Sequence, residues 1–131
     1  MSERPMIVMY VEDDADIREL MEIIFEREAD ISVLCCPPSL GIVEQIRHVM
    51  PDVLMLDVMM PGMDGITIAK HVRADAQLAR IPYVFITAKM QPQEQDELWA
   101  QCPLAVFAKP FDALAMPGEL RALLAKHRAA R

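Results

Sequence analysis

The chain has 131 residues, of which 53% are hydrophobic, and a formal net charge of −7; this suits one globular domain with a single core and leaves no room for a second. The acidic balance, with a pI near 4.9, excludes direct nucleic-acid binding through a general basic surface, which requires clustered Lys and Arg. Three cysteines without a CxxC pair indicate neither a disulfide framework nor a zinc site. The first residues do not form a signal-peptide pattern, and no apolar stretch reaches the roughly 18 residues of a membrane span. We therefore predict one cytoplasmic domain over residues 1–131, without a separate output domain and without membrane contact.

Five apolar runs predict β-strands, and stretches with helical spacing of apolar residues lie between them. In chain order the predicted strands cover residues 5–11, 31–36, 52–57, 81–87 and 104–108. The first predicted helix carries Ile17, Leu20, Met21 and Ile24 on one side, with Asp14 or Asp16 as its cap. The later helices carry Ile42, Ile46 and Val49, then Ile66, Ala69 and Val72, then the polar stretch 91–101, and finally Leu120, Leu123 and Leu124. The chain therefore repeats a strand-helix unit five times.

The strand runs are almost continuously apolar rather than alternating, as expected for parallel strands that helices cover on both faces. The pattern predicts an α/β fold, a doubly wound five-stranded parallel sheet flanked by five helices. Pro61 and Gly62 predict a turn before the third helix, and Pro117 falls in the first turn of the last helix, where its missing N–H is tolerated.

Four of the predicted strands end in, or directly before, a chemically useful side chain. Glu12 and Asp13 follow the first strand, Asp57 ends the third, Thr87 ends the fourth, and Lys109 follows the fifth. In an open parallel sheet the carboxyl ends of the strands share one edge, where ligands bind. We therefore expect carboxylates, a hydroxyl and an ammonium group to meet in one pocket.

These residue types are those needed for magnesium-assisted phosphoryl transfer to a carboxylate. A carboxylate that attacks phosphorus faces charge repulsion, which a divalent cation relieves. Mg²⁺ prefers hard oxygen ligands and binds through one or two carboxylates, which Glu12, Asp13 and Asp57 could supply. Lys109 could neutralise one phosphoryl oxygen and Thr87 could donate to another.

Taken singly, each residue also has an ordinary structural interpretation. Asp57 could cap the turn that follows it, and the acids after the first strand could supply a helix cap and a favourable charge at a helix start. Thr87 could be an ordinary strand end, and Lys109 a loop lysine. It is their joint arrangement at one sheet edge that favours the chemical interpretation.

The chain resembles the receiver domains of two-component response regulators, and particularly the single-domain chemotaxis type, over essentially its whole length. The resemblance is carried by four motifs: Val11-Glu12-Asp13-Asp14, Leu56-Asp57-Val58-Met59-Met60-Pro61-Gly62-Met63-Asp64-Gly65, Thr87-Ala88 and Lys109-Pro110-Phe111. It implies a flavodoxin-like fold with strand order 2-1-3-4-5, counting five strands along the chain. It also implies a cis bond between Lys109 and Pro110.

The resemblance also implies a role for each residue of the pocket. Asp57 would accept a phosphoryl group, with Thr87 as the switch hydroxyl and Lys109 as the contact to the phosphoryl group. Mg²⁺ would be held by Asp13 and Asp57 directly, by Glu12 through water, and by the backbone carbonyl of Met59. Met59 and Lys89 lie where the family tunes the lifetime of the phosphoryl group.

One position departs from the family. Three residues before Lys109 the family often has an aromatic residue that turns inward during switching, and this chain has Val106. Phe107 is adjacent but points to the opposite face of its strand. We therefore expect activation to use a smaller rearrangement, or altered dynamics of the helix at residues 91–101.

The sequence thus predicts a phosphorylation-controlled signalling switch that accepts its phosphoryl group from a histidine kinase or a histidine phosphotransfer protein. It would be a monomer or weak dimer that acts on another protein through the fourth and fifth helices and the fifth strand. It would catalyse only its own phosphoryl transfer and dephosphorylation. Two alternatives stay open: a receiver-like interaction module that is not phosphorylated, and a magnesium-dependent phosphatase with an aspartyl-phosphate intermediate. The phosphatase lacks support at Met59, where such enzymes generally need a second acid.

Overall fold

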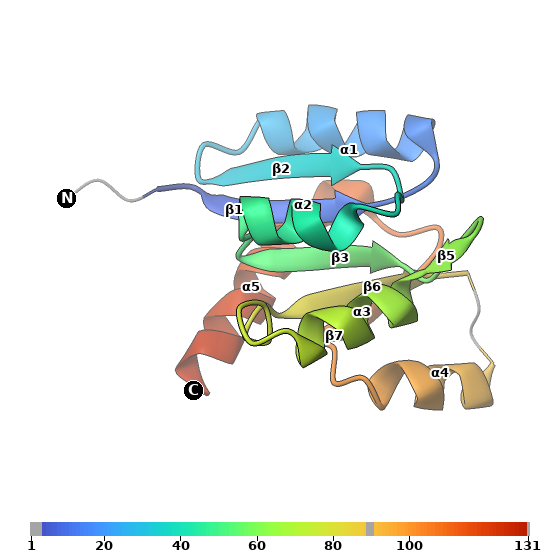
Figure 1. Ribbon diagram of the computed structural model, residues 1–131. Coiled ribbons are helices and arrows are strands. Elements are labelled where there is room, and N and C mark those ends of the chain that lie inside the picture. Colours follow the sequence, from blue (N-terminus) through green and yellow to red (C-terminus); the bar gives the residue numbers. More distant parts are fainter. Residues whose placement is uncertain (1–3, 89–90, 131) are drawn as a thin grey trace.

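Five parallel strands form the central sheet of the computed structural model, which describes residues 4–88 and 91–130 (Figure 1). The strands are β1 (Met6–Val11), β2 (Ile31–Cys36), β3 (Val53–Asp57), β6 (Tyr83–Thr87) and β7 (Ala105–Ala108). Their order across the sheet is β2-β1-β3-β6-β7, and every neighbouring pair is parallel. The predicted order 2-1-3-4-5 is confirmed, because β6 and β7 are the fourth and fifth strands of this sheet.

Five α-helices connect and cover the strands: α1 (Ala15–Glu26), α2 (Ile42–Val49), α3 (Gly65–Ala74), α4 (Pro92–Trp99) and α5 (Met116–Ala129). A short 3-10 turn, η1 (Ala113–Ala115), leads into α5. Of the two candidate caps of α1, Asp14 is the one used, since its carboxylate accepts the N–H groups of Asp16 and Ile17. Pro117 lies in the first turn of α5, as predicted.

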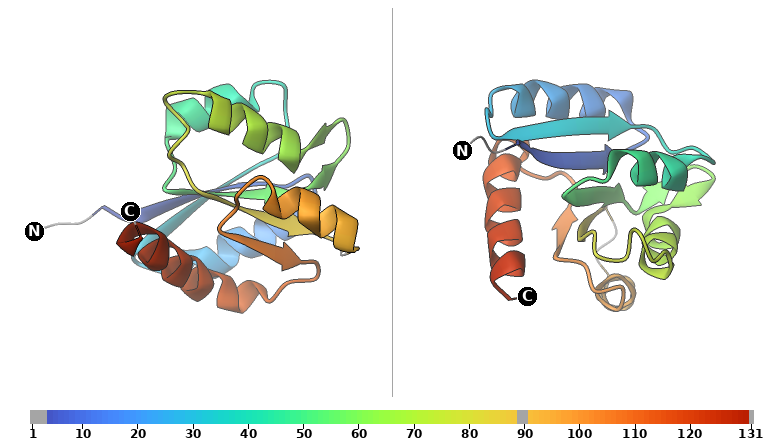
Figure 2. Two further views of the ribbon diagram at one scale, coloured as in Figure 1. Left: turned by 90° about the horizontal axis from the view of Figure 1, so that it is seen from below. Right: turned by 60° about the vertical axis from the view of Figure 1, so that its left-hand side comes forward.

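The helices divide between the two faces of the sheet (Figure 2). Buried residues of α1 and α5 pack on one face, against Val8, Tyr10, Val53, Met55, Val84 and Ile86 of the strands. Buried residues of α2, α3 and α4 pack on the other, against Met9, Val11, Leu54, Leu56, Tyr83 and Phe85. The central strands β3 and β6 are buried at every position, which explains their continuous apolar sequence.

Two features differ from the sequence interpretation. Leu20 falls on the predicted apolar stripe of α1 but is 47% exposed, because the sheet and α5 take up Met21, Ile24 and Phe25 instead. The segment predicted as a turn before α3 contains a two-stranded antiparallel hairpin, β4 (Met59–Met60) and β5 (Met63–Asp64). Gly62 lies in its turn with φ +73, a conformation that glycine adopts without steric cost.

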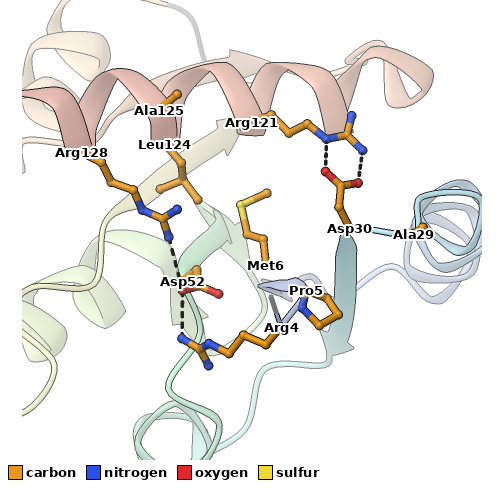
Figure 3. A pocket seen from close by; sticks show the side chains of 10 residues that line it. All are labelled: Arg4, Pro5, Met6, Ala29, Asp30, Asp52, Arg121, Leu124, Ala125 and Arg128. Atoms are coloured by element: carbon orange, nitrogen blue, oxygen red, sulfur yellow. Dashed lines mark hydrogen bonds and ion pairs between the residues drawn. The ribbon is translucent and has the colours of Figure 1, made fainter. Parts of the chain in front are cut away.

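At the amino ends of the strands, ion pairs tie α5 to the sheet (Figure 3). Arg128 and Arg4 both contact Asp52, at 3.5 and 3.4 Å, and Asp52 also accepts the Ile7 N–H at 2.7 Å. Arg121 donates from Nε to Asp30 at 2.8 Å and holds the pKa of that carboxyl below its usual range. The three arginines and two aspartates line a pocket of about 710 Å³, and each guanidinium group in it is paired with a carboxylate.

Candidate functional site

The polar residues predicted to meet at the carboxyl edge of the sheet do so. Asp57 ends β3, and Thr87 ends the neighbouring β6, one residue beyond the β6 partner of Asp57. Glu12 and Asp13 follow β1, and Lys109 follows β7. Three residues of the site are buried inside the edge: Glu12, Asp57 and Thr87, which are 0%, 2% and 0% exposed.

Carboxylate oxygens of Glu12, Asp13 and Asp57 all lie within 4.8 Å of one another. Asp13 is exposed and the other two acids are buried, so that the group opens to solvent on the Asp13 side. Three hard oxygen donors at this spacing fit the ligand preference of Mg²⁺. The donor set therefore suits a divalent cation.

Lys109 is the cation that pairs with the carboxylates of Glu12 and Asp57, while Arg18 Nη1 donates to the Glu12 backbone carbonyl at 2.7 Å. Its Nζ lies 2.9 Å from Asp57 Oδ2 and 3.1 Å from Glu12 Oε2. Burial alone would lower the pKa of Lys109, but the hydrogen bonds to Asp57 and Glu12 outweigh burial and raise that pKa above its ordinary value. Lys109 therefore stays an ammonium group at neutral pH, and its bond to Pro110 is cis, as the resemblance implied.

The backbone after β3 orients the Asp57 side chain. The N–H of Met59 donates to Asp57 Oδ1 at 3.3 Å, so that one carboxylate oxygen faces the backbone and the other faces Lys109. Gly65, at the start of α3, donates its N–H to the Val58 carbonyl at 3.0 Å. A β-carbon at Gly65 would stand 2.6 Å from the Asp57 carbonyl oxygen, so the close approach of α3 to β3 requires glycine there.

Glu12 has a hydrogen-bond partner that the sequence analysis missed. The hydroxyl of Tyr10 donates to Glu12 Oε2 at 2.8 Å. Burial first, and then the charge of Glu12, raise the pKa of Tyr10 far above its ordinary value, so its hydroxyl remains a donor. The signal available in the sequence was the spacing, since residues i and i+2 of a strand share one face.

The two positions expected to tune the lifetime of the phosphoryl group are Met59 and Lys89. The Met59 side chain is 56% exposed at the start of β4, and its backbone N–H is the group seen to contact Asp57. Lys89 lies outside the described residues.

A doubly wound parallel sheet with a buried aspartate, neighbouring acids and a lysine at its carboxyl edge defines a receiver-type site. A model of the response regulator receiver domain matches residues 8–121, and the chain belongs to this family.

Similar proteins of known sequence are response regulators. The transcriptional regulatory protein CseB of Streptomyces coelicolor is 31% identical over 122 residues, which are 89% of this chain and 48% of that protein. The response regulator Rre1 of Synechocystis is 27% identical over 125 residues, which are 95% of this chain and 54% of that protein. The chain thus spans about half the length of the curated relatives it matches.

Solved structures support the fold. The chemotaxis response regulator CheY4 of Vibrio cholerae superposes with a TM-score of 0.80 at 24% identity, covering 91% of this chain and 98% of that one. The BeF3-activated receiver domain of Klebsiella pneumoniae RstA gives a TM-score of 0.78 at 24% identity, covering 90% of this chain and 97% of that one.

In the described part of the chain, none of the helices combines the length and apolar character needed to cross a bilayer.

Proposed function

We propose that this receiver domain is a phosphorylation-controlled switch whose acceptor is Asp57 and whose phosphoryl transfer depends on Mg²⁺. The observation that carries the proposal is the position of Asp57, buried at the sheet edge, 2.9 Å from Lys109 and grouped with Glu12 and Asp13. A lone buried carboxylate would be costly, whereas this one has a cation and a backbone donor beside it. Family membership gives the class of protein, and the residue roles are inferred from the site.

In the proposed reaction, a carboxylate oxygen of Asp57 attacks the phosphorus of a phosphohistidine on a histidine kinase or phosphotransfer protein. The new O–P bond forms as the P–N bond breaks, and the imidazole leaves with the electron pair of that bond. Lys109 offsets the charge of one phosphoryl oxygen, and the Thr87 hydroxyl donates to another. The product is an acyl phosphate on Asp57.

Mg²⁺, held by Asp13, Asp57 and the Met59 carbonyl with Glu12 acting through water, would supply positive charge that relieves repulsion between the carboxylate and the phosphoryl group. Three acids form this group, while the nearby cations are Lys109, which pairs with the carboxylates of Glu12 and Asp57, and Arg18, which donates to the Glu12 backbone carbonyl. This excess of negative charge favours cation binding.

The phosphodonor has an apolar surface to dock on beside the site. Ile17, Leu20, Pro110, Phe111 and Ala113 line a pocket of about 350 Å³ that also includes Lys109. We propose that the phosphodonor protein contacts this surface, which includes the exposed Leu20. Leu20→Ala should slow transfer from the partner while leaving phosphorylation by acetyl phosphate unchanged. Equal loss with both donors would contradict this docking site.

The test of the switch is the intact mass of wild type, Asp57→Asn and Asp14→Asn after incubation with acetyl phosphate and Mg²⁺. Asp14 is the matched control, because it is an exposed acid beside the pair and Asn preserves its capping role. We expect an added phosphoryl group on wild type and Asp14→Asn, absent in Asp57→Asn and after chelation. A wild-type chain that neither gains the group nor binds beryllium fluoride would favour the interaction module.

The phosphatase alternative makes a separate prediction. It requires turnover of a phosphate ester by the purified chain that is lost on changing Asp57. The exposed Met59, which takes the place of a second acid, argues against it.

We also propose that the chain, as a monomer or weak dimer, passes its signal to another protein through α4, β7 and α5.

A further inference from the structure

Tyr10 is a buried tyrosine in the strand that leads to the acids. Its ring lies at 0% exposure in the core between the sheet and helices α1 and α5, together with Met21 and Leu120. A buried hydroxyl needs a hydrogen-bond partner. Here the partner is Glu12 Oε2 at 2.8 Å, two residues further along the chain.

Glu12 is itself fully buried, and its carboxylate accepts from three groups. The Tyr10 hydroxyl reaches Oε2, and the Asp14 N–H reaches Oε1 at 3.1 Å. The third group is the Lys109 ammonium, 3.1 Å from Oε2 and 3.3 Å from Oε1. Lys109 is also bonded to Asp57, so among these three donors it is the one that Glu12 shares with the acceptor.

We propose that Tyr10 is a positioning residue of the cation site, which acts by holding the Glu12 carboxylate through a neutral hydrogen bond. The inference rests on the proposed Mg²⁺ dependence of the switch and adds a residue to its machinery.

The physical reason is that Glu12 and Asp57 share the Lys109 ammonium group, whereas Arg18 donates to the backbone carbonyl of Glu12. Tyr10 and the Asp14 N–H are neutral donors, so they hold Glu12 without repelling a metal ion. They keep Glu12 in place when Lys109 turns to a phosphoryl group on Asp57. Without the hydroxyl, Glu12 would depend more heavily on Lys109. The ammonium group would then compete with Mg²⁺ for the same carboxylates, and binding of the metal would weaken.

The chain offers a matched control in Tyr83. Its hydroxyl donates to the Gln101 backbone carbonyl, and its ring is 4% exposed in the core on the other face of the sheet. Tyr83→Phe therefore removes the hydroxyl of a buried tyrosine and its part-buried bond without touching the acids. Tyr10→Phe keeps the ring and its packing, and thermal unfolding of the metal-free chains checks that both variants are folded.

The experiment is a calorimetric titration of Mg²⁺ into metal-free wild type, Tyr10→Phe and Tyr83→Phe. Loss of an outer partner at a metal site typically weakens metal affinity by about 10–100-fold. Tyr10 acts on Glu12, which itself acts through water, so we expect an effect at the low end of that range, about tenfold, in Tyr10→Phe. Tyr83→Phe should change it by less than about twofold, since distant sites behave independently. In a Glu12→Gln background, Tyr10→Phe should also change affinity by less than about twofold, because the hydroxyl acts through Glu12.

Equal Mg²⁺ affinity of wild type and Tyr10→Phe would overturn the inference and leave the proposed function intact. An undiminished effect of Tyr10→Phe in the Glu12→Gln background would also overturn it, since the tyrosine would then act through the fold. A wild-type chain that binds no Mg²⁺ would instead remove the proposed function and the inference with it.

Discussion

Replacing Gly65 by alanine should disturb Asp57, the proposed phosphoryl acceptor, through the backbone. The new β-carbon would stand 2.6 Å from the Asp57 carbonyl oxygen, 3.1 Å from the Asp57 carbonyl carbon and 3.3 Å from Leu56 Cβ. Two of the three nearest atoms are backbone, so no flexible side chain can move aside. Restoring ordinary contact at 3.4 Å to the carbonyl oxygen requires α3 and β3 to separate by roughly 0.8 Å.

The expected cost follows from this displacement. Overpacking of a well-packed site typically costs about 1–3 kcal/mol, and alanine regains about 0.5–1 kcal/mol of helix preference. Subtracting the second range from the first leaves about 0–2.5 kcal/mol, so we expect Gly65→Ala to lower the free energy of unfolding by about 1 kcal/mol. Because misplacement by about 1 Å can cost about a hundredfold in rate, phosphorylation of Asp57 should slow by at least about tenfold.

Urea denaturation and the rate of phosphorylation by acetyl phosphate measure the two effects, with Gly118→Ala as the control. Gly118 lies in α5, and a β-carbon at this position would have nothing within 4 Å, so alanine there should stabilise the chain by about 0.5–1 kcal/mol. The two glycine variants should thus shift stability in opposite directions. A Gly65→Ala chain as stable and as rapidly phosphorylated as wild type would refute the close-approach argument.

Three further outcomes are expected. Met50 ends α2 in the left-handed region with φ 49. Met50→Gly should therefore have a free energy of unfolding about 0.5–1 kcal/mol higher than Met50→Ala, seen as a higher urea midpoint, and equal midpoints would contradict this. Burial raises the pKa of Cys35 to about 12 and also raises that of Cys36, whereas Cys102 is exposed; a thiol reagent should therefore label Cys102 alone in the native chain, and rapid labelling of all three thiols would argue against the packing of β2. Mg²⁺ at 100 times its dissociation constant should add about 2.7 kcal/mol to the free energy of unfolding, a gain that chelation reverses and Asp13→Asn removes; a wild-type melting curve insensitive to Mg²⁺ would count against the cation site.

The sheet and its functional edge were predictable because both depend on patterns in single strands. The central strands β3 and β6 are apolar up to their last residue, and that last residue lies at the shared edge whatever its neighbours are. Asp57 and Lys109 could therefore be brought together from the sequence although they stand 52 positions apart. The edge strand β2 is less completely buried than β3, which its sequence does not reveal.

The burial and bonding partners of individual side chains were not predictable where several residues could make the same contact. Leu20 and Met21 are both apolar and adjacent, and only the docking of α1 decides that Met21 is buried and Leu20 is not. The bond between Tyr10 and Glu12 follows from strand alternation, but a tyrosine in an apolar run has a sufficient explanation as a core residue. The hairpin at β4 and β5 is only two residues long on each side, too short to leave an alternating pattern.

Val106 bears on how the proposed switch would operate, because the resemblance to receiver domains implies that an aromatic residue often stands at this position. Val106 packs in the core on the side of α2, α3 and α4, whereas Phe107 packs on the side of α1 and α5, so the neighbouring ring cannot replace the missing aromatic. Of the α4 residues, Leu98 is the one that is buried, and it lines a cavity of about 70 Å³ together with Thr87 and Met59. If the Thr87 hydroxyl moves toward a phosphoryl group, as the proposed switch requires, the side chains that share this cavity, Leu98 among them, are in place to respond. Because α4 packs on the core through its buried Leu98, we expect a displacement there to alter how the helix lies on the sheet.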